Sequence, residues 1–256
     1  MKKIGSVWRI LFIYILLISS FAKATVNFYD GQRHIIDYVI NDDVVLDDFS
    51  SGTSGTYLDL INGGIIKGNL TAHNNNTISV NGGIVEGSVT IWSGEVIVTS
   101  GSINGWVWSD NGSCTIVNGG VVGSIISLTG FAMINGGKVA SVASDFGSQV
   151  FVSGGISSGG LYAKDDGIIY LDGTDFKVNG IPIGYQHGVS EFVNMTDDNV
   201  IRGSITGVLR DGTQLDSMFE IHNIGGSFGA DIIVIPEPTT CLLFLGSLSF
   251  LRRKPH

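Results

Sequence analysis

The side chains of this chain that could do chemistry are mostly carboxylates, and they are scattered. Glu86, Glu95, Asp110 and Asp145 are isolated, whereas Asp165-Asp166 and Asp197-Asp198 are adjacent pairs. Neighbouring residues of a strand point to opposite faces, so each pair needs a loop to converge. We therefore predict no catalytic residue and read most of these acids as solvated loop charge. Asp165-Asp166 and Asp197-Asp198-Asn199 stay open as weak Ca²⁺ ligands.

Histidine and cysteine add little to this inventory. The five histidines are His34, His73, His187, His222 and His256, and none of them has the spacing of a metal ligand. No Ser/His/Asp arrangement stands out among so many serines. Cys241 lies near the end of the chain, which leaves Cys114 alone in the body and excludes an internal disulfide there. We predict neither a metal nor a cofactor.

The elements that must carry these residues recur with a period of 17 to 19 residues. The repeated unit is a turn of the Asn-Gly-Gly type, at residues 62–64, 81–83, 100–102, 118–120, 135–137, 153–155 and 172–174. Glycine and asparagine adopt positive φ at low cost, so these triplets are turns between short apolar runs. A fixed turn with equivalent apolar positions favours parallel stacking over hairpins. We predict an all-β, right-handed parallel β-solenoid (β-helix) of about 6–8 turns, with an antiparallel sandwich or barrel as the alternative.

Three apolar positions per repeat should form inward ladders. The first precedes the turn, at Ile61, Val80, Thr99, Val117, Ile134, Val152 and Leu171. The second follows it by three, at Ile65, Ile84, Ile103, Val121, Lys138 and Ile156. The third comprises Leu70, Val89, Val107, Ile125, Val142 and Leu161. An outward stripe is expected two residues before each turn, at Leu60, Ser79, Val98, Ile116, Met133, Phe151 and Tyr170.

The segments on either side of the repeats have a different sequence pattern. Residues 57–173 form the repeats, residues 25–56 a cap or first turn, and residues 174–235 a C-terminal β cap. Within this last segment, residues 176–183 and 204–221 are predicted hairpins around Asn179-Gly180 and Asp211-Gly212.

Tryptophan is the residue type that points to a ligand. Val107 and Val89 belong to an inward ladder, so Trp106, Trp108 and Trp92 should lie outward on adjacent turns. Exposed indoles on a rigid sheet suit stacking against sugar rings. The alternative is that a cap or loop covers them. Ice binding would need aligned threonines, and Thr71, Thr77, Thr90, Thr99 and Thr115 show no such alignment.

Many parallel β-helix proteins degrade polysaccharides with carboxylate clusters and a basic residue, and the predicted solenoid resembles them. An enzyme of that kind would need Lys67, Lys138 or Lys164, the basic residues of the repeats, beside two acids. The repeats carry no long insertion that could build a cleft. We predict that the protein is not an enzyme and keep a polysaccharide-active enzyme as the alternative.

The beginning of the chain has the layout of a secretory signal peptide. Lys2, Lys3 and Arg9 are followed by an apolar run from Ile10 to Phe21 and by the small residues Ala22 and Ala24. We predict cleavage by signal peptidase after Ala24, so that residues 1–24 are removed. Residues 25–235 then carry seven basic and 22 acidic residues, a formal charge of −15. Such a surface repels nucleic acid, and we predict no nucleic-acid partner.

The end of the chain carries a second targeting pattern. Pro236, Glu237 and Pro238 precede the uncharged run TTCLLFLGSLSFL, and Arg252, Arg253 and Lys254 follow it. A helix of this run would rise about 20 Å, less than a bilayer core of about 30 Å. Its basic end would lie on the cytoplasmic side.

This arrangement resembles the PEP-CTERM sorting signal, over residues 236–256 only. The resemblance implies export and transient insertion of the C-terminal hydrophobic helix into the inner membrane. It also implies recognition by a membrane transpeptidase of the exosortase type and removal of the tail. A short membrane anchor that is never cut is the alternative. Together these patterns predict a structural or adhesive protein of the cell surface or extracellular matrix of a bacterium with a double-membrane envelope, associated with exopolysaccharide.

Overall fold

The computed structural model describes residues 24–47, 54–156, 159–185, 187–193, 199–222 and 229–235. The predicted signal segment up to Lys23 and the predicted tail, residues 236–256, lie outside the described residues. The predicted C-terminal hydrophobic helix and the Asp197-Asp198 pair also lie outside them. Among the described residues, no helix has the length and apolar character needed to cross a membrane.

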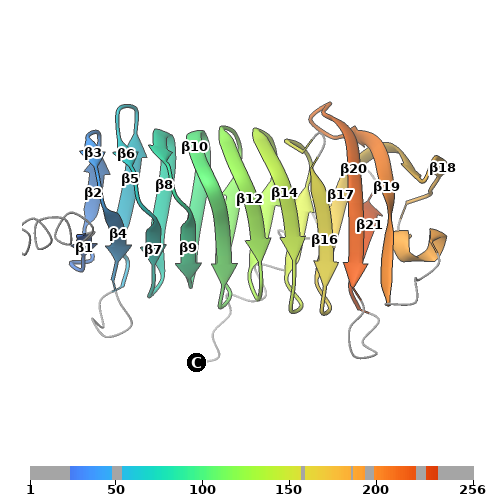
Figure 1. The fold of residues 1–256 in the computed structure, drawn as a ribbon, viewed down its shortest axis with the longest axis horizontal. Coiled ribbons are helices and arrows are strands. Elements are labelled where there is room, and N and C mark those ends of the chain that lie inside the picture. Colours follow the sequence, from blue (N-terminus) through green and yellow to red (C-terminus); the bar gives the residue numbers. More distant parts are fainter. Residues whose placement is uncertain are drawn as a thin grey trace, which may run out of the picture.

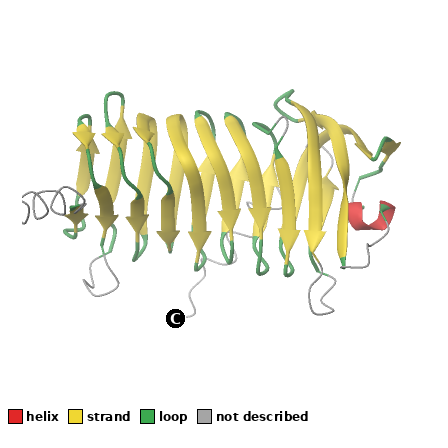
Figure 2. Ribbon diagram, viewed as in Figure 1, coloured by secondary structure: helices red, strands yellow, loops and turns green. Residues whose placement is uncertain are grey.

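The body is a parallel β-solenoid of about seven turns, as its repeats predict. Most turns contribute a short strand to each of three faces, and equivalent strands of successive turns pair in parallel. The described strands of face 2 end at β14. Figure 1 shows the resulting rod, with the strands of one face side by side along its length. Figure 2 shows that a single short helix interrupts this all-β architecture within the described residues. The right-handed sense of the solenoid stays a prediction.

The three faces take their strands in chain order. Face 1 holds β2 (Arg33–Ile36), β5 (Tyr57–Ile61), the first parts of β8 (Asn76–Val85) and β10 (Gly94–Asp110), β11 (Cys114–Val117), β13 (Phe131–Ile134), β15 (Gln149–Val152), the first part of β17 (Ile168–Val178) and β21 (Asp231–Ile235). Face 2 holds β3 (Val39–Ile40), β6 (Ile65–Ile66), the end of β8, the middle of β10 and the first parts of β12 (Val121–Ser127) and β14 (Lys138–Ser144). Face 3 holds β1 (Thr25–Phe28), β4 (Asp43–Leu46), β7 (Leu70–Ala72), β9 (Val89–Trp92), the ends of β10, β12 and β14, β16 (Gly160–Lys164) and β20 (Gln214–His222).

The core is a set of stacked aliphatic ladders along the axis. The third predicted ladder is confirmed over its whole length, because all six of its members are fully buried. On face 1, Val80, Val117, Ile134, Val152 and Leu171 are buried as predicted. Since each turn is too small to enclose a core alone, stacking supplies the burial that stabilises it.

The predicted register was wrong at several positions. Leu60 and Val98, expected outward, are fully buried, and Asp59 and Ile97 occupy the outward row instead. The strands are irregular just before these two glycine turns, so counting back from the turn misplaces the inward residue by one. In the second predicted ladder, Ile103 and Ile156 are buried as predicted. At the other four positions the buried residue is Ile66, Val85, Val122 or Val139, one position after the residue predicted.

The glycine corners hold the turns at close spacing. Gly101 has φ +82°, and an added side chain there would overlap the carbonyl oxygen of Gly83 on the preceding turn. The neighbouring asparagines form a partial side-chain ladder, in which Asn135 Nδ2 donates to Asn118 Oδ1 at 2.8 Å.

The N-terminal segment is part of the solenoid. β1 pairs in parallel with β4, and β2 with β5, so residues 25–47 contribute the first strands of the stack.

At the C-terminal end the chain leaves the solenoid and returns to it. β17 pairs antiparallel with β18 (Ile181–Pro182) and with β19 (Val200–Leu209), and β19 pairs antiparallel with β20. The hairpins predicted around Asn179-Gly180 and Asp211-Gly212 are therefore confirmed. β20 then pairs in parallel with β16 and β21 with β17, so the chain rejoins faces 3 and 1. These pairings do not support a separate C-terminal cap. The 3-10 helix η1 (Val189–Phe192) lies before β19.

Candidate functional site

The three predicted tryptophans lie on the outer side of face 3, but they differ in exposure. Trp106 is 51% exposed, whereas Trp92 and Trp108 are half-buried. The Trp108 indole Nε1 is buried without a hydrogen-bond partner. Trp92 lies at the corner beside β10, with its ring stacked on His73 at 6.5 Å between centroids. Trp106 is therefore the indole of this group with a broad surface available to a ligand.

The environment of Trp106 is rich in small hydroxyl side chains. Its backbone nitrogen donates to Ser88 Oγ of the preceding turn at 3.3 Å. On the following turns the same row continues as Ser124 and Ser141, whose hydroxyls hydrogen-bond at 2.7 Å. These strands are neighbours on the face that Figure 1 shows in front.

A second aromatic residue lies beside this row, which continues past Gly160 to Met218 on β20, and sequence reasoning missed it. Gly160 follows Ser141 in the row, and a side chain at Gly160 would overlap the ring of Tyr162, so that ring lies over the glycine. Tyr162 is 42% exposed. It follows the ladder residue Leu161 just as Trp108 follows Val107, and this signal could have identified it. We call the outer surface formed by Trp106, Ser124, Ser141, Gly160 and Tyr162 the aromatic surface.

The aromatic surface is flat and rigidly supported. Trp106 and Gly160 are three strand steps apart, about 14 Å at about 4.8 Å per step. The ladder residues beneath it, Val107, Ile125, Val142 and Leu161, are fully buried. Two aromatic rings separated by hydroxyl-bearing strands can stack against sugar rings and hydrogen-bond the hydroxyls between them.

A second cluster lies at the corner between faces 3 and 1. Lys164 Nζ is 3.2 Å from Asp165 Oδ2 and 3.8 Å from Asp145 Oδ2. The Phe146 ring, 57% exposed, lies 5.7 Å from the same nitrogen. Of the three lysines singled out in the repeats, Lys164 thus stands beside two acids, whereas Lys67 and Lys138 pair with no described acid.

At this corner, burial and the Lys164 charge have opposite effects on the pKa of Asp145. Burial raises the pKa of the Asp145 carboxyl, although Lys164 partly offsets the effect. The hydrogen bond with Asp165 raises the pKa of Lys164. Asp165 and Asp166 have φ values of +45° and +67°, so the adjacent acids occupy a tight turn. Asp165 is engaged by the lysine.

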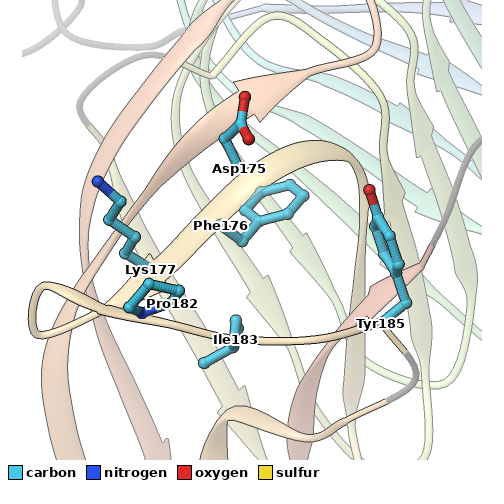
Figure 3. A pocket seen from close by; sticks show the side chains of 6 residues that line it. All are labelled: Asp175, Phe176, Lys177, Pro182, Ile183 and Tyr185. Carbon is cyan, nitrogen blue, oxygen red and sulfur yellow. The ribbon is translucent and has the colours of Figure 1, made fainter.

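Two hollows lie near the C-terminal hairpins. The larger, about 570 Å³, is lined by Asp175, Phe176, Lys177, Pro182, Ile183 and Tyr185. Figure 3 shows the rings of Phe176 and Tyr185 facing this space, with the Lys177 side chain extending away. The smaller, about 370 Å³, lies where Arg210 and Asp211 of the β19–β20 turn meet Asn135 and Ser153. Neither set of side chains provides convergent acid–base groups.

The remaining expectations concern metals and ice. Within the described ranges, no group of three or more His, Cys, Asp or Glu side chains could hold a metal ion. Thr71 and Thr90 do pair on adjacent strands, but the row continues as Trp108 and Ile126. A regular threonine array is therefore not formed on this face.

The chain has no match among family models, curated proteins or solved structures.

Proposed function

We propose that this protein is an exported structural or adhesive component of the cell surface or extracellular matrix that binds polysaccharide through the aromatic surface. The observation that carries the binding proposal is the exposed pair Trp106 and Tyr162 on one rigid face, with hydroxyl-bearing strands between them. The signal-peptide pattern and the exosortase-type tail support export and sorting. In this proposal the solenoid acts as a spacer that displays its binding face.

The geometry favours an extended glycan lying along the rod. Strands of face 3 repeat every about 4.8 Å, a spacing on the scale of one sugar ring. A chain crossing the strands would stack on Trp106, pass over the hydroxyls of Ser124 and Ser141, and stack again near Tyr162. Because the ladders fix the backbone beneath it, little ordering of the protein would oppose binding.

The charge of the body narrows the class of glycan. The formal charge of −15 over residues 25–235 opposes the approach of a polyanion. We therefore propose a neutral polysaccharide rather than a uronate-rich or sulfated one.

Retention of the mature protein on insoluble neutral polysaccharides tests this proposal. Trp106→Ala and Tyr162→Ala should each weaken binding by about 2- to 12-fold, since one aromatic contact contributes about 0.5–1.5 kcal/mol. The double variant should lose most retention. Equal binding by the wild type and the double variant would remove the aromatic surface from the proposal.

Tyr38→Ala provides a matched control for these variants. Tyr38 is 52% exposed, similar to Trp106, but it lies beside β3 in the first turn of the solenoid. Its removal should leave retention unchanged. If Tyr38→Ala lowers binding as much as Trp106→Ala, the binding is general aromatic adhesion instead of recognition at the aromatic surface.

A polysaccharide-active enzyme is the second candidate, and one observation favours it. Lys164 lies beside Asp145 and Asp165, the arrangement of a basic residue and two acids that such chemistry needs. Product analysis after prolonged incubation with acidic and neutral polysaccharides tests it. New reducing ends or unsaturated products that disappear in both Lys164→Met and Asp145→Asn would favour the enzyme. We propose that none form, because Lys164 is already neutralised by its two carboxylates.

A further inference from the structure

The outer side of face 1 changes character along the rod. In the first turns its outward side chains are mixed, with Ile35 and Tyr57 among the polar residues Arg33, Asp59, Thr77 and Ser79. From β11 onward they are largely apolar, namely Ile116, Phe131, Met133, Phe151, Ile168, Tyr170 and Ile233. We call this second set the apolar strip. It extends as far as β21, the last strand of the face.

The rings of the apolar strip are organised as a continuous ladder. Phe131 and Phe151 have centroids 5.2 Å apart, and Phe151 and Tyr170 stack at 4.4 Å with an interplanar angle of 11°. Burial raises the pKa of the Tyr170 hydroxyl. A row of aromatic and aliphatic side chains on the outer side of a solenoid is a docking surface for another apolar segment.

The chain itself supplies such a segment where the strip ends. β21 finishes at Ile235, and the uncharged run TTCLLFLGSLSFL follows after Pro236-Glu237-Pro238. From β21 to β10 there are five strand steps, which span about 24 Å at about 4.8 Å each. The thirteen-residue run would span about 20 Å as a helix and more if extended. Its length as a helix therefore suits the strip.

The charges at the β10 end of the strip favour a tail that runs from β21 toward β10. Arg252, Arg253 and Lys254 follow the apolar run. Glu95 faces outward on β10, one strand beyond Cys114 in its row. A tail that runs from β21 toward β10 would bring its basic end to this carboxylate and to the strongly acidic body.

We propose that residues 239–251 dock on the apolar strip of the same molecule, with the basic residues 252–254 toward β10. The fold thereby shields the apolar tail from water whenever the tail is not inserted in a membrane. Removal of the tail would expose the strip. This inference depends on the strip and the tail composition, and it holds whether or not a transpeptidase cuts the tail.

Disulfide trapping in the full mature chain, without detergent, tests the docking. Met133 of the strip lies in the same row as Ile233 of β21, three strand steps away. With the two further residues to Ile235, Met133 is about 16 Å from the end of β21. Cys241, six residues beyond Ile235, has an extended reach of about 20 Å. Met133→Cys in a Cys114→Ser background should therefore form an intramolecular disulfide with Cys241 under mild oxidation.

Ala143→Cys, also with Cys114→Ser, is the matched control. Ala143 is likewise half-buried and outward, but it lies on face 3. We expect intramolecular disulfide to form at least about tenfold faster from Met133→Cys, because docking raises the local concentration of the tail. Adding Phe151→Asp to the Met133→Cys variant should remove most of this advantage, and circular dichroism should confirm that the β fold is kept.

Three results would overturn the proposal. Equal rates from the two cysteine positions would mean that the tail samples both faces without docking. Disulfides that are intermolecular and depend on concentration would assign the strip to a second copy of the chain. A rate that Phe151→Asp leaves unchanged would show that the strip plays no part. Sorting in cells is not involved in any of these readouts.

Discussion

At the scale of single residues, Cys114 is the side chain whose chemistry is altered most clearly. It faces outward on β11 of face 1 and is half-buried. Burial, assisted by the nearby Glu95 charge, raises the pKa of its thiol from 9.0 to about 11. Because the thiolate is the reactive form, the native protein should protect this cysteine from alkylation.

Alkylation rates measure this protection directly. In a Cys241→Ser variant at pH 8, native Cys114 should react with iodoacetamide about a hundredfold more slowly than in the urea-unfolded chain, which is the factor expected for two pKa units. The native rate should keep rising to about pH 11. Since the folded pKa exceeds the unfolded one, this thiol favours unfolding as the pH rises above 9. A native rate that levels off near pH 9 would contradict the shift.

At the scale of elements, glycine at the corners has two separable roles. Gly101 and Gly112 both have positive φ, at +82° and +73°. A side chain at Gly101 would also overlap the Gly83 carbonyl oxygen, whereas one at Gly112 would meet open space. Gly112→Ala should therefore cost about 1–2 kcal/mol from backbone strain alone.

Gly101→Ala should cost about 3 kcal/mol or more, because the adjacent turns must move apart as well. Urea unfolding of the two variants compares the free energies of unfolding. Equal losses would show that turn spacing does not depend on the absence of a side chain at this corner.

The same elements show how far the sequence could predict the fold. The recurring glycine turns and the ladder from Leu70 to Leu161 predicted parallel stacking, and that ladder is buried throughout. The register failed at Leu60 and Val98, because the strands are irregular between these residues and the following turn. Such an irregularity depends on pairing with neighbouring turns and leaves no mark in a one-dimensional pattern.

The aromatic surface could be predicted only in part, because its other contacts depend on how the chain folds. The outward direction of Trp106 follows from the inward position of Val107, and the structure exposes its indole. The half-burial of Trp108 and Trp92 depends on side chains from other turns. The approach of Lys164 to Asp145 is likewise a contact between neighbouring turns. The folding of the Tyr162 ring over Gly160 is a local contact within β16.

At the scale of the whole molecule, the rod carries two different outer surfaces. The aromatic surface lies on face 3 and the apolar strip on the C-terminal half of face 1. In our account the first binds a neutral glycan, and the second holds the tail that directs the protein through the envelope. A solenoid suits this division, because each face extends with every turn while the core beneath it stays continuous.

Intact mass and fractionation of the protein from its native host, with and without the exosortase-type transpeptidase, test this account most directly. We predict loss of residues 1–24 and of about the last twenty residues, with the body at the cell surface or in the extracellular matrix. Without the transpeptidase the tail should be retained and the protein should stay with the inner membrane. A full tail retained in the inner membrane of the wild-type host would contradict the account, because the rod would then be a tethered periplasmic protein.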